Sequence, residues 1–139
     1  MLKIAVIDGQ GAGIGRTFIK ECKKVLKNKV YIFALGTNEV AANNMIKNGA
    51  DEKYVGEKDI VRFLLEHKLD AIVGPIGILI DGGINGEITR ELSNAIFKLD
   101  CVKYIIPLQK HGIYIPGTKD LAIKDIIKEI IKNLEIYAT

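Results

Sequence analysis

An aspartate followed by evenly spaced glycines is the part of this chain whose residue types could do chemistry. Asp8 ends an apolar run, and glycines at positions 9, 11, 13 and 15 precede apolar residues with helical spacing. This order predicts a strand, a tight turn and a helix whose first N–H groups point at a bound anion. Glycine also lets a ligand approach the backbone closely. We therefore expect a small anionic or nucleotide-like ligand to be held by Gly9, Gly11, Gly13, Ile14 and Gly15.

Asp8 itself suggests further chemistry. Its carboxylate could orient a ligand hydroxyl or a cation, or serve an enzyme as base or nucleophile. If a later loop folds back, Asp8, Asp81 and Glu87 would together offer the hard oxygen ligands that Mg²⁺ prefers. The alternative is structural: Asp8 accepts hydrogen bonds from nearby N–H groups, while Asp81 and Glu87 serve as turn and helix-start residues.

The spacing of the glycines decides how specific the turn is. The dinucleotide fingerprint G-x-G-x-x-G fails, because Ile14 and Arg16 stand where its last glycine would fall. The looser G-x-x-x-G-x-G fits and resembles the cofactor loop of short-chain dehydrogenases, although Asp8 replaces that family's threonine. Tyr54 and Lys58 have the spacing of that family's catalytic Tyr-x-x-x-Lys pair but lie much too early in the chain.

The predicted strand at 30–35 places a second pair of polar residues at the same edge. Thr37 and Asn38 follow this strand, and we expect them to contact a sugar or base of the ligand. The first acid after the strand is Glu39, which falls inside the next predicted helix. The strand therefore lacks the terminal carboxylate that would bind the ribose of a dinucleotide.

The loop of residues 74–86 is longer than the usual connection of about two to six residues. Gly74 and Gly77 at its start are expected to line the same crevice as the glycine turn. Its apolar residues between Ile76 and Ile84 must be covered. Three alternatives stay open: the loop packs on its own domain, forms a subunit interface, or closes over a ligand. The interface alternative predicts a homodimer, or a non-catalytic protein that docks a partner through residues 76–84.

Strands and helices alternate along the chain, which favours a mainly parallel sheet covered on both faces. After the first strand, further strands are predicted at 30–35, 53–55, 69–73, 102–108 and 113–115. Right-handed crossovers favour the order 3-2-1-4-5, with 113–115 joined antiparallel at the edge through a hairpin at 109–112. The prediction is a single doubly wound Rossmann-like α/β domain over residues 1–139, with a helix at 86–99 before its fifth strand.

Composition excludes several classes of protein. The 139 residues are 48% hydrophobic and 27% charged, as in a soluble globular domain. Without an apolar run of about 20 residues, no membrane span is expected, and we expect a cytoplasmic protein. A net charge of +3 with few aromatic residues argues against nucleic acid. Cys22 and Cys101 are expected to be buried structural thiols, and His67 and His111, the latter at the hairpin tip, to be non-catalytic.

Four motifs distributed along the chain are together specific. They are Ile7-Asp8-Gly9-Gln10-Gly11 with Gly13-Ile14-Gly15, Ala34-Leu35-Gly36-Thr37-Asn38, Ile72-Val73-Gly74-Pro75-Ile76-Gly77, and Gly86-Glu87-Ile88-Thr89. Through them the chain resembles, over nearly its full length, a family of short bacterial proteins known only as a domain of unknown function. This resemblance implies no activity. The expectation of a nucleotide or other phosphate-bearing ligand therefore rests on the residues themselves.

Overall fold

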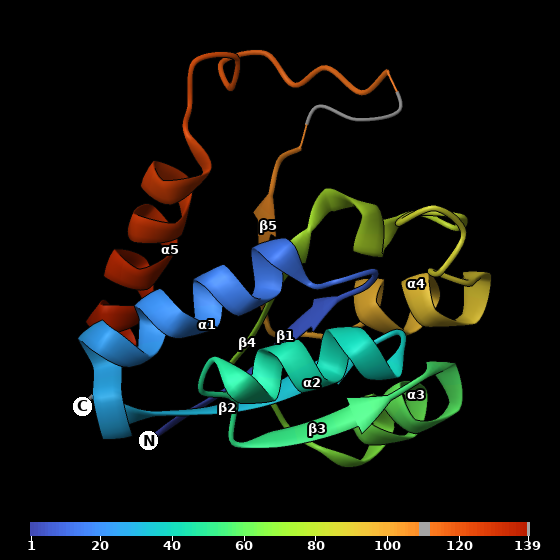
Figure 1. The fold of residues 1–139 in the computed structure, drawn as a ribbon, viewed down its shortest axis with the longest axis horizontal. Helices are drawn as coiled ribbons and strands as arrows, with labels where there is room; N and C mark the ends of the chain where they lie inside the picture. Colours follow the sequence, from blue (N-terminus) through green and yellow to red (C-terminus); the bar gives the residue numbers. More distant parts are fainter. Residues whose placement is uncertain (109–111, 139) are drawn as a thin grey trace.

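The computed structural model describes residues 1–108 and 112–138, which form a parallel β-sheet with helices on both faces (Figure 1). The strand order is β3-β2-β1-β4-β5, and neighbouring strands pair in parallel throughout. The strands are β1 (Leu2–Asp8), β2 (Val30–Gly36), β3 (Glu52–Val55), β4 (Ala71–Pro75) and β5 (Val102–Ile106). The helices are α1 (Gly13–Leu26), α2 (Glu39–Lys47), α3 (Glu57–Glu66), α4 (Arg90–Phe97) and α5 (Ile123–Tyr137), with short 3₁₀ helices η1 (Lys27–Lys29) and η2 (Ile76–Leu79). The predicted α/β class and strand order are confirmed.

The central strand β1 is apolar on both sides because helices cover both faces of the sheet. Ile4 and Val6 face the layer of α1, α2 and α5, while Ala5 and Ile7 face the layer of α3 and α4. All four side chains are fully buried. This alternation follows the two-residue period of a strand, and burial on both faces is typical of parallel sheets.

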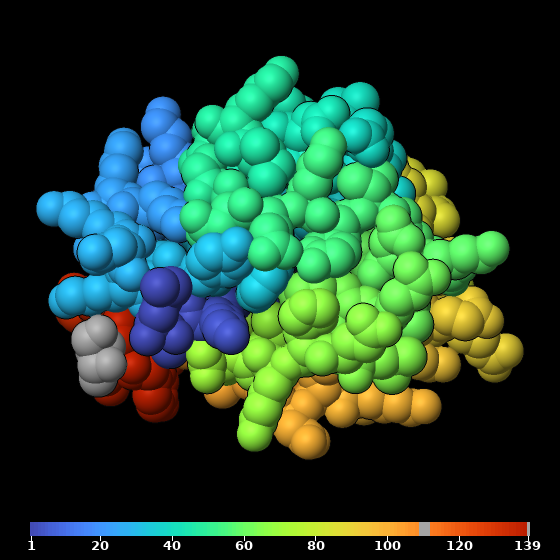
Figure 2. All heavy atoms as spheres, turned by 90° about the horizontal axis from the view of Figure 1, so that it is seen from below, coloured from blue at the N-terminus to red at the C-terminus, as the bar shows by residue number. Residues whose placement is uncertain are grey.

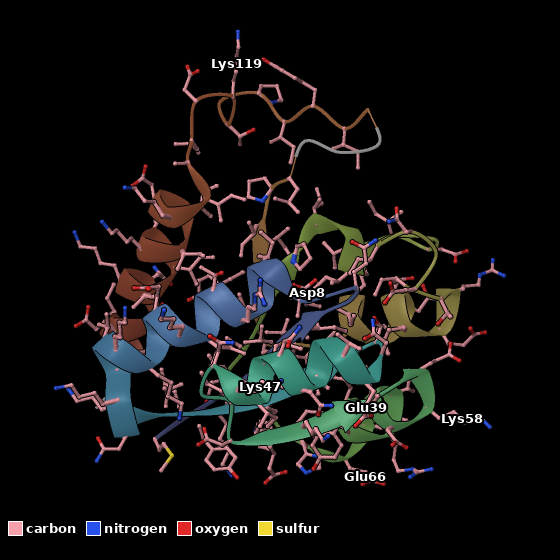
Figure 3. All side chains as sticks on the ribbon, in the orientation of Figure 1. Asp8, Glu39, Lys47, Lys58, Glu66 and Lys119 are labelled. Atoms are coloured by element: carbon pink, nitrogen blue, oxygen red, sulfur yellow. The ribbon has the colours of Figure 1, made fainter. Side chains whose placement is uncertain are left out.

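The predicted antiparallel edge strand is wrong. Residues 113–115 have no strand structure, and Ile113 instead lines a cavity beside the sheet. Pro116 follows directly and has no N–H to donate to a ladder. Residues 112–122 arch away from the sheet before α5 begins (Figure 1), and Lys119 lies at the outer end of this arch (Figure 3). The turn predicted to join 113–115 to the sheet falls mostly on residues 109–111, His111 included, which lie outside the described residues.

The fourth helix is shorter than predicted. Residues 80–87 form successive turns, and α4 begins only at Arg90, after Thr89. The Thr89 side chain accepts a hydrogen bond from the backbone N–H of Leu92 and so caps the helix. The apolar spacing from Ile88 onward predicted the helix, but it could not separate the helix from the turns before it.

The first residues and the end of α5 lie side by side, at the opposite end of the sheet from the carboxyl ends of the strands (Figure 1). Figure 2 views this region from below and shows the first residues next to the end of α5. Both segments are therefore away from the edge of the sheet where parallel folds bind ligands. In the described part of the chain, no helix is both long and apolar enough to cross a membrane.

The two cysteines differ in burial. Cys22 is fully buried under α1, and burial raises the pKa of its thiol to about 12 although Lys23 opposes the shift. Cys101 is only half-buried, and burial raises the pKa of its thiol although the charge of Lys103 opposes the shift. The expectation of a buried structural thiol is therefore confirmed for Cys22 and holds only in part for Cys101.

Replacing Phe18 tests the layer between α1 and the sheet. Phe18 is fully buried, so Phe18→Ala should lower the free energy of unfolding by about 3–5 kcal/mol. The control is Phe97→Ala, since the Phe97 side chain is 71% exposed. That change should stay within about 0.5 kcal/mol of wild type. Urea unfolding followed by circular dichroism measures both, and equal effects would contradict the assignment of the core.

Candidate functional site

The glycine turn is anchored by the carboxylate of Asp8. Its Oδ1 accepts a hydrogen bond from the N–H of Gly9 and its Oδ2 accepts one from the N–H of Gly15, each at 2.8 Å. The Asp8 side chain is buried at the end of β1, close to the start of α1 (Figure 3). Ala12 precedes the helix and has no side chain that can cap it, so Asp8 caps α1 from the preceding strand.

This arrangement limits what Asp8 can do chemically. Both of its carboxylate oxygens hold the backbone of the turn. Proton abstraction or nucleophilic attack by Asp8 would have to release one of these bonds. Asp8 does line the cavity described below, as the sequence predicted, but its observed contacts are those of a structural anchor.

The backbone between Gly9 and Gly13 is held in an unusual conformation. Gln10 and Ala12 have φ values of 49° and 55°, in the left-handed region that residues with a Cβ adopt rarely. The Ala12 N–H donates to the Gly9 carbonyl at 2.8 Å, and Asn44 Nδ2 donates to the Gly11 carbonyl at 2.9 Å. These contacts fix the turn before any ligand binds.

The turn leaves backbone donors available at the start of α1. Among the described residues, no acceptor bonds the N–H groups of Gly11, Gly13 or Ile14. The N–H groups of Gly9 and Gly15, by contrast, are taken by Asp8. Of the five amides that the sequence predicted to hold a ligand, Asp8 thus takes two, and the binding of a ligand by the other three stays a prediction.

The glycines of the turn fall into two groups. A Cβ on Gly9 would lie 2.6 Å from Thr37 Oγ1 and 2.8 Å from Glu87 Oε1, and one on Gly15 would lie 3.1 Å from the Cβ of Asp8. Among residues 1–108 and 112–138, nothing lies within 4 Å of a Cβ added to Gly11 or Gly13, and neither glycine has a φ in the left-handed region. Packing therefore favours glycine strongly at position 9 and more weakly at position 15, where Met45 Sδ, 3.0 Å from the added Cβ, and Asp8 would have to shift, and it does not favour glycine at 11 and 13.

A cavity of about 510 Å³ opens beside Gly11 and Gly13. One wall is the glycine turn, a second is the loop that follows β4, and Leu108 and Ile113 after β5 complete it. Its side-chain lining is mainly apolar. The apolar residues that line it are Ala12, Ile14, Pro75, Ile76, Ile80, Ile84, Leu108 and Ile113.

The loop after β4 both packs on its own domain and walls the cavity. Ile78 is fully buried in the layer of α3 and α4, whereas Ile76 and Ile84 line the cavity. Gly77 also lines it and packs against Ile84. A subunit interface through this loop stays a prediction, and it would have to use Ile80, whose side chain is 40% exposed.

Glu87 joins the glycine turn to the end of β2. Its Oε1 accepts hydrogen bonds from Thr37 Oγ1 at 2.5 Å, from Asn38 Nδ2 at 2.9 Å and from the Gln10 N–H at 3.0 Å. Asn38 also donates to the Gln10 carbonyl at 3.1 Å and caps α2 by accepting from the Ala41 N–H. Thr37 and Asn38 therefore hold a protein carboxylate, and neither lines the cavity.

The environment of Glu87 favours its charged form. Burial alone would raise the pKa of the carboxyl, but hydrogen bonds from Thr37, from the Gln10 backbone and from Asn38 outweigh burial and lower it below its ordinary value. Each of these groups donates to an oxygen that protonation would weaken as an acceptor.

The remaining predicted residues are placed as follows. Gly74 packs beneath β1, where an added Cβ would lie 2.7 Å from the Ile7 carbonyl oxygen, and it does not line the cavity. Asp81 lines the cavity.

Among residues 1–108 and 112–138, no three His, Cys, Asp or Glu side chains gather as they would around a metal ion. Asp8, Asp81 and Glu87 thus do not converge as the magnesium hypothesis required.

Three features of the site were missed by sequence reasoning. Leu108 and Ile113 line the cavity although they were assigned to strands. Asn44 fixes the Gly11 carbonyl from the second turn of α2, and nothing in its local pattern indicated this contact. The role of Glu87 had a weak signal, because Thr37 and Asn38 follow the strand that neighbours β1 and are hydrogen-bond donors to which no acceptor within the protein was assigned.

Alanine at Gly9 and at Gly11 should have opposite consequences for stability. Gly9→Ala forces a methyl group against Thr37 and Glu87, so it should lower the free energy of unfolding by about 1–3 kcal/mol. Gly11→Ala meets open space and should leave it unchanged or raise it by up to about 1 kcal/mol. Thermal and urea unfolding compare the two; a destabilised Gly11→Ala protein would contradict this division of the glycines.

The lowered pKa of Glu87 predicts how stability depends on pH. A carboxyl with a lower pKa in the folded protein stabilises it above its ordinary pKa, and that contribution is lost as pH falls through the folded value. The difference in unfolding free energy between wild type and Glu87→Gln should therefore shrink on acidification. Urea unfolding at pH values from about 7 to about 3 measures it. Glu91→Gln, on the exposed side of α4, is the control and should show a smaller change.

The fold has structural neighbours of low sequence identity. It is similar to an arsenate reductase in the phosphate-binding state, with a TM-score of 0.50 and 14% identity over 100% of both chains. It is also similar to a dodecameric FMN-dependent UbiX-like decarboxylase from Escherichia coli O157:H7, with a TM-score of 0.54 and 11% identity, covering 100% of this chain and 95% of that one. At such identities the likeness concerns the α/β fold alone.

Sequence comparison places the chain in a family. No protein among the curated sequences matches it. The family described as "Domain of unknown function (DUF3842)" matches residues 3–138, which is nearly the whole chain and agrees with the resemblance that the four motifs indicated. The protein therefore belongs to the DUF3842 family of domains of unknown function.

Proposed function

We propose that this protein binds a small phosphate-bearing ligand, nucleotide-like in its combination of an anionic group and an apolar ring, in the cavity beside the glycine turn. The observation that carries the proposal is the pair Gly11 and Gly13. Neither packing nor a left-handed φ requires glycine there, and both face the cavity. Close approach of a ligand to the backbone is the remaining physical reason for glycine at such positions.

The electrostatics of the turn suit an anion. The N–H groups of Gly11, Gly13 and Ile14 lie at the amino end of α1, where the helix dipole adds partial positive charge. Asp8 would repel a phosphate, but hydrogen bonds from Gly9 and Gly15 offset part of its negative charge. The anionic group of the ligand would therefore lie on the cavity side of the turn, over Gly11 and Gly13.

The cavity suits the rest of the ligand. Its volume of about 510 Å³ lies within the usual range for small-molecule sites. Ile76, Ile80 and Ile113 give it apolar walls that would pack against a planar ring. An apolar cavity with a few polar groups gathered at one end is the usual form of a cofactor or substrate pocket.

Phosphate-bearing compounds and their dephosphorylated counterparts test the proposal. FMN, AMP and pyridoxal 5′-phosphate should be compared with riboflavin, adenosine and pyridoxal by thermal shift and calorimetry. At least one phosphate-bearing compound should bind and stabilise the fold, by about 2.7 kcal/mol at a concentration 100 times its Kd. Its counterpart should bind at least about tenfold more weakly, because it loses the charge-assisted hydrogen bonds.

Variants connect the binding to the turn. Gly11→Ala and Gly13→Ala should each weaken the same ligand at least about tenfold, which corresponds to about 1.4 kcal/mol, while the protein stays folded. Val40→Ala is the control, because Val40 is 62% exposed on α2 and does not line the cavity. If no phosphate-bearing compound binds, or if both glycine variants bind it as wild type does, the proposal fails.

A further inference from the structure

The end of β2 is where open parallel sheets receive the second half of a dinucleotide. The pyrophosphate lies over the first glycine turn, one half of the molecule extends toward the later strands, and the adenosine ribose reaches the end of the second strand. In this chain Thr37 and Asn38 follow the end of β2. They lie beside Asp8, because Gly36 pairs with Asp8 in the sheet and the Thr37 N–H donates to the Asp8 carbonyl. Whether this place is open decides which nucleotides the fold can hold.

Glu87 fills this place. Its carboxylate lies within hydrogen-bond distance of Thr37 Oγ1, Asn38 Nδ2 and the N–H of Gln10, so the polar groups that a ribose would use are already engaged. It also places a negative charge beside the path that a second phosphate would follow. Repulsion of this kind is how many sites reject the wrong ligand.

The boundary of the cavity coincides with this carboxylate. The space above Gly9 is filled by Thr37, Glu87 and Ile84, whereas the space above Gly11 and Gly13 is open. The cavity is lined by residues 8–14, by the loop after β4 and by residues after β5, and no described residue of β2 or α2 contributes to it. The open volume therefore lies on the β1–β4–β5 side of the turn.

The loop that carries Glu87 is held in place on both sides. The Gly82 N–H donates to the Ile88 carbonyl at 2.8 Å, and the Ile88 N–H donates to the Gly83 carbonyl at 3.0 Å. Thr89 then bonds Glu57 at the start of α3. Because the backbone of Glu87 lies between these fixed points, shifting that backbone would break bonds in the loop, and rotating the side chain away would break its bonds to Thr37, Asn38 and Gln10.

We infer that the site takes a mononucleotide and excludes dinucleotides, with Glu87 as the residue that closes the adenosine side. This inference rests on the proposed function and adds a specificity to it. The phosphate of the ligand lies at the amides of Gly11 and Gly13, and its ring extends toward β4 and β5. Glu87 acts on specificity by position and charge and touches no reacting atom.

The test compares each dinucleotide with its own mononucleotide half. FMN is paired with FAD, and nicotinamide mononucleotide with NAD, and the dissociation constants are measured by calorimetry. At least one mononucleotide should bind wild type at least about thirtyfold more tightly than its dinucleotide. FAD or NAD binding within about threefold of its half would overturn the inference and leave the proposed function standing.

Three variants assign the selectivity to Glu87. Glu87→Ala opens the end of β2 and should reduce the preference at least about tenfold, by strengthening dinucleotide binding. Glu87→Gln keeps Oε1 as an acceptor for the same donors but removes the charge, so its preference should lie between those of wild type and Glu87→Ala. Glu91→Ala, which removes an exposed carboxylate of α4, is the control and should leave it unchanged. An unchanged preference in folded Glu87→Ala would overturn the role of Glu87.

Two further outcomes separate this inference from the proposed function. If FMN, nicotinamide mononucleotide and AMP all fail to bind while pyridoxal 5′-phosphate binds, the mononucleotide inference is overturned and the proposed function survives. If no phosphate-bearing compound binds, both are overturned. If Glu87→Ala does not fold, the test is the ratio of the dinucleotide to the mononucleotide dissociation constant in wild type. A ratio of at least about thirty supports a closed β2 side, and a ratio within about three overturns it.

Discussion

The hydrogen bonds from two glycine N–H groups to the Asp8 carboxylate determine the geometry of the whole carboxyl edge. They join the end of β1 to the first turn of α1, and they do so from a buried side chain in the centre of the sheet. Because Asp8 takes the N–H of Gly15, the helix is capped without using the N–H groups of Gly13 and Ile14. One carboxylate thus both stabilises the start of α1 and decides which of its donors stay available.

Glu87 divides the same edge into two unequal parts. It engages Thr37, Asn38 and Gln10, and so closes the side toward β2. Its charged form is the one that these donors stabilise, which explains why a partly buried carboxyl keeps a lowered pKa despite burial. The two acidic residues therefore have complementary effects: Asp8 holds the turn so that its donors face the cavity, and Glu87 limits the cavity to the β1–β4–β5 side.

The fold could be predicted from sequence because its signals are local. Alternating strands and helices, with right-handed crossovers, suffice for the order 3-2-1-4-5. The error at 113–115 arose because a short apolar run before Pro116 looks like a strand, whereas Ile113 is apolar because it lines the cavity.

The glycine turn was located because its signal is local too, but which of its glycines are open depends on neighbours distant in sequence. Gly9 and Gly11 look equivalent in the chain, but Thr37, Ile84 and Glu87, far along the sequence, fill the space above Gly9 and leave that above Gly11 open. Likewise, the contact between Glu87 and Asn38 depends on the path of a loop that no periodicity describes.

The apolar wall of the cavity gives the free donors their importance. Gly11 and Gly13 are exposed, so water can reach their N–H groups, while Ile76 and Ile84 line the other side of the same cavity. The same apolar surroundings strengthen any hydrogen bond that a ligand later makes there, because the local dielectric constant is lower than in water. One cavity is therefore lined both by polar donors, at Gly11 and Gly13, and by apolar side chains of the loop after β4. Without the apolar walls, water would satisfy the donors. Without the donors, the isoleucines would favour a space filled by other apolar side chains. Together they leave an opening that suits the proposed ligand, which has an acceptor at one end and an apolar body at the other.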